Sequence, residues 1–241
     1  MSIRALHPLR GEPDFAWRGE QPTRVEALSD IVFAFALTLL VVSAEPPASF
    51  PELISQLWGI PGFAAAFAIL LLIWHAHYIF FRRYGLEDGW TTTLNAGLLF
   101  LILLFVYPLK YLATMLSQWL QSVFAGRPEA PLSLLEAQDA LVILSVGYAA
   151  LFLLFALLYR HAYARRRDLD MTPKEAAMTR FSFWQQVIHA GVGALAALAA
   201  AVTPVFWAPF MGFLYFLIGP LIFLAGALVG GASEKTPTQS D

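Results

Sequence analysis

Residues 24–42 read RVEALSDIVFAFALTLLVV, a charged and polar start that changes within two turns into an apolar run interrupted by Thr38 alone. Before it stand Pro22 and Thr23, and Glu26 follows Thr23 by three residues. This spacing is typical of a capping box, in which each of the two side chains bonds the backbone N–H at the other position. The stretch therefore predicts a helix that begins near Thr23, before the apolar segment enters a membrane.

The whole chain is almost as apolar as this segment. Of its 241 residues, 59% are hydrophobic and 13% are charged, whereas about a quarter of a soluble domain is charged. This composition excludes a soluble enzyme, a disordered chain and a collagen-like repeat. The net charge of −2 argues against nucleic acid as a partner, and the absence of cysteine excludes disulfides and thiolate metal sites. A multi-pass membrane protein without a cofactor remains.

A membrane-spanning helix needs about 20 mostly apolar residues. Six candidate segments lie at 29–45, 59–81, 94–115, 139–159, 183–205 and 206–230. We therefore predict an all-α polytopic membrane protein with six transmembrane helices. Its three parts are residues 1–28, a cytoplasmic segment with the start of the first helix, residues 29–230, the six-span domain, and residues 231–241, a cytoplasmic polar tail.

The positions of the cations predict the orientation, because Lys and Arg are retained on the cytoplasmic side of short loops. Arginines precede the first span, follow the second at Arg82 and Arg83, and cluster between the fourth and fifth at 160–180. The loop at 46–58 on the opposite side has no cation. Both termini are therefore expected in the cytoplasm, and the protein in the cell membrane.

Ionisable and polar side chains at membrane depth are costly and mark candidate functional positions. His75 and His77 lie about 200° apart around a helix, so one face does not present both to a metal ion. The sequence also lacks a G-x-S-x-G turn and a pair of intramembrane aspartates, which disfavours a protease. Neither an enzyme nor a metal site is predicted, and His189 is interpreted as an interhelical hydrogen-bonding residue.

The first span separates its polar and apolar residues onto different faces. At about 100° per residue, one stripe holds Ile31, Phe35, Thr38, Leu39 and Val42, and Asp30 points elsewhere. The expected donors to Asp30 are His77 on the second span and Asn95 on the third. Two interpretations follow, a polar contact that holds three helices together or a proton relay.

These residues resemble the motifs of the transmembrane protein 175 family of potassium channels. Residues 24–30 are similar to its Arg-x-x-x-Phe-Ser-Asp signature, with Leu28 in place of Phe. Further similarities, in the second and third spans, are Trp74, His77 and Phe80, then Leu94, Asn95, Leu99, Phe100 and Pro108. The resemblance covers about the first half of the chain.

The resemblance implies a potassium-preferring cation leak channel that lacks a re-entrant filter loop and assembles as a homotetramer. Its partners would be potassium ions, the lipid bilayer and other copies of the chain. The first helices would line the pore, with Ile31 on the lining face, an apolar constriction at Phe35, Leu39 and Val42, and a ring of Thr38 hydroxyls. The implied network that supports this helix consists of Arg24, Ser29, Asp30, Trp74, His77 and Asn95.

Two other classes of protein stay open at this point. A proton-coupled secondary transporter would use Asp30 and His77 as its relay. Such transporters often contain inverted repeats, and no repeat is detectable in this sequence. A membrane scaffold subunit without transport activity is the other alternative.

Overall fold

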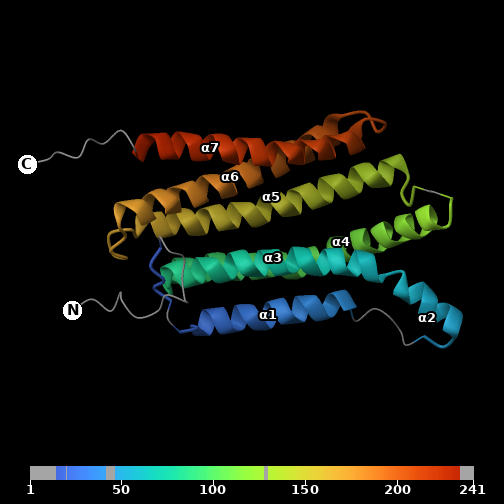
Figure 1. The fold of residues 1–241 in the computed structure, drawn as a ribbon, viewed down its shortest axis with the longest axis horizontal. Coiled ribbons are helices and arrows are strands. Elements are labelled where there is room, and N and C mark those ends of the chain that lie inside the picture. The colour runs from blue at the N-terminus through green and yellow to red at the C-terminus, as the bar shows by residue number, and fades with distance from the viewer. Residues whose placement is uncertain (1–14, 20, 42–46, 128–129, 234–241) are drawn as a thin grey trace, which may run out of the picture.

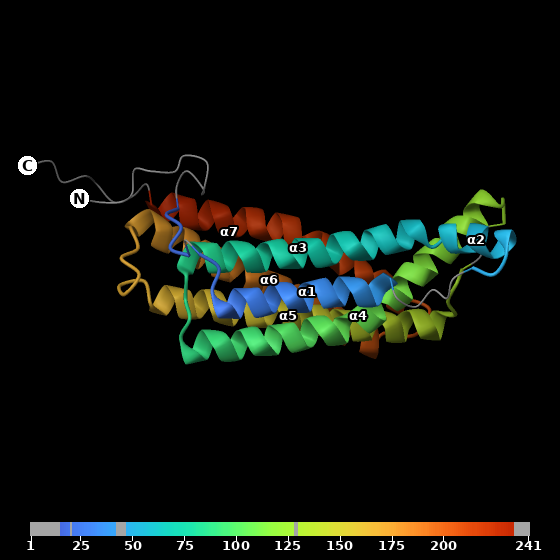
Figure 2. The same ribbon diagram turned by 90° about the horizontal axis from the view of Figure 1, so that it is seen from below.

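The computed structural model describes residues 15–19, 21–41, 47–127 and 130–233 (Figure 1). The fold is all-α, as predicted, and its long helices lie side by side in an elongated bundle (Figures 1 and 2). α1 begins and α7 ends at the same end of this bundle. The elements are α1 (Arg24–Val41), α2 (Phe50–Leu57), α3 (Ile60–Tyr84), α4 (Gly89–Phe124), α5 (Leu134–Ala164), α6 (Pro173–Val202), the 3₁₀ helix η2 (Ala208–Leu217) and α7 (Ile218–Ser233).

Five helical segments within the described ranges are long and apolar enough to cross a membrane. They are α3, α4, α5, α6 and the segment Ala208–Ala227 formed by η2 and α7. α1 is not among them, because three of its 18 residues are charged, namely Arg24, Glu26 and Asp30. It nevertheless packs along α3 and α4. The structure therefore matches five of the six predicted spans by length and composition.

α1 begins as the sequence predicts. The backbone N–H of Thr23 donates to Glu26 Oε2 at 2.8 Å, and the N–H of Glu26 donates to Thr23 Oγ1 at 3.1 Å. This reciprocal pair is the predicted capping box, which satisfies donors that the first helical turn leaves without partners. The end of the predicted first span, residues 42–45, lies outside the described residues.

α4 is much longer than predicted. The third span was expected to end at residue 115, but the helix continues through Pro108 to Phe124 over 36 residues. At about 1.5 Å per residue it is about 54 Å long, against about 30 Å for the hydrocarbon core of a bilayer. The helix is therefore longer than the hydrocarbon layer that it would cross. A second difference is the turn at 203–207, where the sequence predicted that one span directly follows another.

The core lies among α1, α3, α4 and α5. Phe80, Phe81 and Tyr84 at the end of α3 are fully buried, and the Phe80 ring meets Tyr159 of α5 edge to face, with centroids 5.2 Å apart. Towards the other end of α3, the backbones approach so closely that a Cβ on Gly62 would clash with the Ala113 carbonyl oxygen of α4. This crossing therefore requires glycine.

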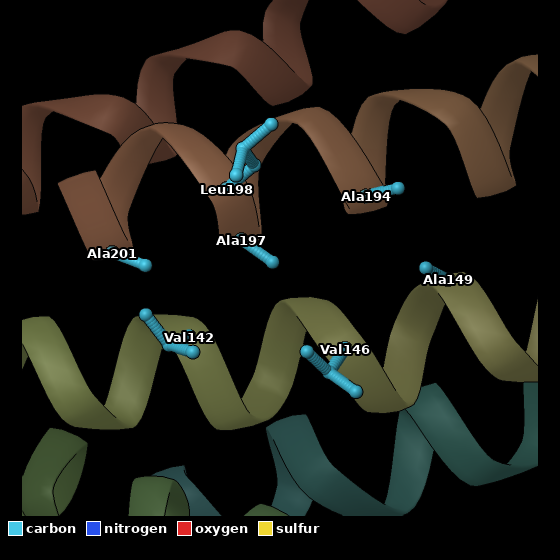
Figure 3. A pocket seen from close by; sticks show the side chains of 7 residues that line it. All are labelled: Val142, Val146, Ala149, Ala194, Ala197, Leu198 and Ala201. Atoms are coloured by element: carbon cyan, nitrogen blue, oxygen red, sulfur yellow. The ribbon is translucent and has the colours of Figure 1, made fainter.

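α5 and α6 form a second close pair through small residues. A Cβ on Gly193 would lie 3.2 Å from the Cβ of Ala149. Beside this contact the two helices leave an apolar groove, shown in Figure 3, whose lining side chains carry no polar atom. These side chains are Val142, Val146, Ala149, Ala194, Ala197, Leu198 and Ala201.

Candidate functional site

α1 has one buried face and one face without a partner in the subunit. Phe33, Ala36 and Leu40 are buried against the core. Ile31 and Phe35, on the opposite side, remain 66% and 55% exposed. The exposed apolar face predicted from the helical periodicity is therefore present in the structure at these two positions.

The remaining residues of the predicted stripe differ in their surroundings. Thr38 is exposed beside Phe35, and its hydroxyl donates to the Ala34 carbonyl oxygen at 2.9 Å. The hydroxyl oxygen keeps acceptor capacity towards the exposed side. Leu39 is half-buried and packs against the core, and Val42 lies outside the described residues. Of the predicted stripe, Ile31, Phe35 and Thr38 are therefore exposed, and Leu39 lies at the edge of the exposed face.

Asp30 is held by a partner that the sequence analysis did not assign to it. Its Oδ1 accepts a hydrogen bond from the indole Nε1 of Trp74 in α3 at 2.8 Å. The expected donors, His77 and Asn95, bond to each other instead. The prediction of those donors is therefore wrong, although the contact still joins α1 to α3.

A second polar connection begins at the neighbouring residue, Ser29. The Asn95 amide of α4 donates to Ser29 Oγ at 3.0 Å, and Asn95 Oδ1 lies 2.8 Å from His77 Nε2 of α3. All three residues are at most 2% exposed. The chain of bonds links α1, α4 and α3, so five of the six predicted network residues are joined in two groups.

The direction of this buried chain can be assigned from its donors and acceptors. Ser29 Oγ–H donates to the Val25 carbonyl oxygen at 2.8 Å, so its oxygen accepts from the Asn95 amide N–H. Asn95 Oδ1 then accepts from His77, which must carry its proton on Nε2. Asp30 is bonded to an indole, which donates only. No hydrogen bond joins Asp30 to His77 among the described residues, so the polar contacts of α1 fall into two separate groups.

The arginine that connects α1 to a neighbouring helix is Arg82 of α3, not Arg24 of α1 itself. Arg24 is exposed, and no hydrogen bond or ion pair joins it to another described residue. Arg82, at the end of α3, donates from Nη2 to Glu26 Oε1 at 2.7 Å and from Nη1 to the Gly19 carbonyl oxygen at 2.6 Å. The side chains of Arg82 and Glu26 are 10% and 6% exposed. Sequence reasoning read Arg82 only as a marker of orientation, and Glu26 only as a cap.

The segment before α1, residues 15–19, contacts both Arg82 of this ion pair and the start of α6. The backbone N–H groups of Arg18 and Gly19 both donate to the Arg82 carbonyl oxygen at 3.1 Å. Arg18 also forms an ion pair with Glu175 at the start of α6, at 3.1 Å, and donates to the Leu169 carbonyl oxygen. The start of α1 is therefore coupled through α3 to the start of α6.

The other end of α1 receives a cation. Lys110 of α4 donates from Nζ to the Leu39 carbonyl oxygen at 3.3 Å. Carbonyl groups in the last turn of a helix lack intrahelical partners and carry partial negative charge. Lys110 therefore stabilises the end of α1, and the helix is held at both ends and near its middle.

A charged contact also joins α4 and α5 at the end of the bundle where α1 begins. Asp88 caps α4 by accepting from the N–H groups of Trp90 and Thr91, and His161 Nε2 lies 2.7 Å from its carboxylate. Burial alone would raise the Asp88 pKa, but the hydrogen bonds from His161 and the two N–H groups together lower it to about 2.

Within the residues that the structure describes, no group of three or more His, Cys, Asp or Glu side chains could hold a metal ion. His189 of α6 bonds Tyr148 of α5 through Nδ1 and stacks on Phe152, with ring centroids 4.5 Å apart. The prediction that His189 is an interhelical hydrogen-bonding residue is confirmed.

The fold and the site define a multi-pass helical membrane protein whose first helix is held by polar contacts from two neighbouring helices and keeps one apolar face free. The family model described as endosomal/lysosomal potassium channel TMEM175 matches residues 24–106, which contain α1, α3 and the contacts between them. A potassium channel of Marivirga tractuosa is 38% identical over 234 residues, 92% of this chain and 94% of the relative. The chain belongs to the TMEM175 family of potassium channels.

Solved structures agree with this membership. The crystal structure of the potassium channel MtTMEM175, in a variant form bound to a nanobody–MBP fusion, gives a TM-score of 0.82 at 34% identity, covering 92% of this chain and 99% of that one. A lysosomal potassium-selective channel TMEM175 homolog from Chamaesiphon minutus has the same fold at 24% identity, with a TM-score of 0.52 and coverage of 84% and 96%. The likeness thus extends well beyond the first half of the chain, in which the motifs lie.

Proposed function

We propose that this chain forms a homotetrameric, potassium-preferring leak channel whose pore is lined by α1. The observation that carries the proposal is the free face of α1, where Ile31 and Phe35 are exposed while the opposite side is buried in the core. Both the family and the M. tractuosa relative are named for potassium channels. The free face is the surface that further copies would meet.

The spacing along the free face supports a shared axis. Arg24, Ile31 and Thr38 follow one another at seven-residue intervals, as do Leu28 and Phe35, and all five are exposed. A seven-residue repeat keeps one face of a helix turned towards a common axis. The exposed charge of Arg24 also fits a water-filled entrance better than lipid, where a charged group is costly.

The lining would control conduction by size and dehydration. A ring of Phe35 side chains forms an apolar constriction. An ion passes this constriction only when water fills it or when the ring widens. One turn further along α1, the Thr38 oxygens offer acceptors that replace part of the hydration shell. Potassium gives up its hydration water at lower cost than sodium. A Phe35 constriction followed by Thr38 oxygens therefore favours the passage of potassium.

Potassium flux from loaded liposomes that contain the purified tetramer tests the channel function. We expect flux well above that of empty liposomes, and an increase in Phe35→Ala because the constriction widens. Phe223→Ala is the matched control, since Phe223 of α7 is an exposed phenylalanine outside α1. The pore assignment is wrong if Phe35→Ala conducts like the control, and the channel function is wrong if the folded wild-type tetramer is silent.

The role of Thr38 has its own test. We expect Thr38→Ala to lower the preference for potassium over sodium in reversal-potential measurements, whereas Thr38→Ser retains it. Thr93 of α4 is the control, because it is also exposed and makes the same type of bond, to the Gly89 carbonyl oxygen. Equal selectivity in Thr38→Ala and Thr93→Ala would remove the hydroxyl ring from the mechanism.

We also propose that the protein lies in the cytoplasmic membrane with both termini in the cytoplasm. α1 begins and α7 ends at the end of the bundle where Arg82 closes α3. Because the chain has no cysteine, a single cysteine at position 21 or 52 can be labelled with a membrane-impermeant maleimide. Labelling from outside at 52 and not at 21 is expected, and the reverse pattern would invert the topology.

A further inference from the structure

α2 is a short helix with a regular apolar face and little support from its own subunit. Its face comprises Phe50, Leu53, Ile54 and Leu57, which follow the spacing 0, 3, 4 and 7 of one side of a helix. All four side chains are exposed, and Phe50 is 73% exposed. The described ring contact next to α2 joins Trp58 to Phe124 of α4, with centroids 5.7 Å apart.

A helix of this length needs an external partner. Isolated helices shorter than about 12–15 residues are marginal in water, and helical stability comes mostly from packing of an apolar face. α2 has eight residues. Its cap, where Ser49 accepts from the Glu52 N–H at 3.4 Å, satisfies the first turn but buries no apolar surface. Something outside the subunit must therefore cover the apolar face.

The position of α2 indicates what covers it. α2 lies at the end of the bundle opposite Arg82, beyond the start of α3, and on the same side of the subunit as α1 (Figures 1 and 2). If the free face of α1 meets further copies of the chain, as the proposed function holds, then α2 is turned towards those copies and away from lipid.

A complementary surface exists at the same end of the bundle. The distal part of α4 exposes Leu116, Trp119 and Val123 at helical spacing, and it lies beyond residue 115, where the sequence predicts that the third span ends. Residues 47–58 and 116–125 together contain one charged residue, Glu52. Contact between these two surfaces would bury apolar area without burying an unpaired charge, provided Glu52 stays on the outer side.

We propose that the apolar face of α2 packs against the distal part of α4 in a neighbouring copy of this chain. This proposal rests on the proposed tetramer and adds an intersubunit contact at its outer end. It explains why an eight-residue helix persists there and why α4 carries an exposed apolar stripe beyond the predicted end of the third span.

Site-specific photo-crosslinking tests the contact in the full-length protein in membranes. p-Benzoylphenylalanine replaces Leu53 on the apolar face, and Glu52, about 100° away on the adjacent polar side, is the control position. Leu57 is a second apolar site in case the first variant does not assemble. We expect an SDS-resistant dimer at Leu53, at least five-fold more abundant than at Glu52, with the crosslinked peptide mapped to residues 116–124.

Three results would overturn the proposal: no dimer at either apolar site, a crosslink to lipid, or a crosslink confined to one subunit. Two further measurements distinguish failure of the α2 contact from failure of the proposed channel. They are crosslinking with p-benzoylphenylalanine at Phe35 and the potassium flux of the wild type. Dimers at Phe35 with normal flux and none at Leu53 or Leu57 reject the α2 contact alone. The absence of dimers at all three positions rejects the tetramer as well.

Discussion

The buried ion pair between Glu26 and Arg82 gives a quantitative prediction about the start of α1. Glu26→Gln preserves the capping geometry, because glutamine also completes a capping box, but it removes the charge that faces Arg82. The Arg82 side chain is only 10% exposed, and it would keep its bond to the Gly19 carbonyl oxygen. Removing one partner of a buried pair costs about 3–5 kcal/mol. The hydrogen bond from Arg82 to the Gly19 carbonyl oxygen and the capping bond from the Thr23 N–H can both persist. We therefore expect Glu26→Gln to lower the free energy of unfolding by about 3 kcal/mol.

The assay is the free energy of unfolding in detergent micelles, measured in a double-mutant cycle with Arg82→Met. The double variant should be more stable than the sum of the single effects implies, because no uncompensated charge remains buried. Arg24→Gln is the control, since Arg24 is exposed at the same end and surface changes cost about 0.5 kcal/mol or less. Additive effects, or a Glu26→Gln cost no larger than that of the control, would refute the reasoning.

Three further predictions concern packing, pH and an interhelical bond. Gly62→Ala should lower the thermal unfolding temperature strongly, since the new Cβ meets the Ala113 carbonyl oxygen. Gly191→Ala is the control and should leave the unfolding temperature unchanged or raise it, because nothing lies within 4 Å of its Cβ position. Similar temperature shifts in the two variants would contradict the close crossing of α3 and α4 at Gly62. The Asp88 pKa lies at about 2 in the folded protein, against an ordinary value of 3.8. Ionised Asp88 therefore adds about 1–2 kcal/mol to the free energy of unfolding above pH 4, and this contribution is lost as the pH falls towards 2. Asp88→Asn retains the cap and should remove this part of the pH dependence, and identical acid profiles for the two proteins would disprove the assignment. His189→Phe should cost about 1 kcal/mol by leaving the Tyr148 hydroxyl without its bond, with unchanged potassium flux; loss of flux in a folded variant would give His189 a different role.

The features that the sequence predicted correctly are those set by local spacing. The capping box at Thr23 and the free face of α1 both follow from residues within a few turns of one another. The partners of Asp30 and Glu26 were not predicted, because Trp74 and Arg82 reach them from another helix in a register that no periodicity encodes. The full length of α4 was not predicted, because Ser117, Gln118 and Gln121 interrupt the apolar run that defines a span, whereas the helix continues through them.

The anchors of α1 also restrict how the helix can move. Ser29 and Asp30 are adjacent in the chain, and their side chains leave the helix about 100° apart, one bonded to Asn95 of α4 and the other to Trp74 of α3. Rotation of α1 about its own axis would lengthen at least one of these bonds, and sliding along the axis would strain both. Tilting with α3 and α4 as one rigid body breaks neither. In the proposed tetramer, any change in the pore diameter at Phe35 is therefore expected to come from relative displacement of whole subunits.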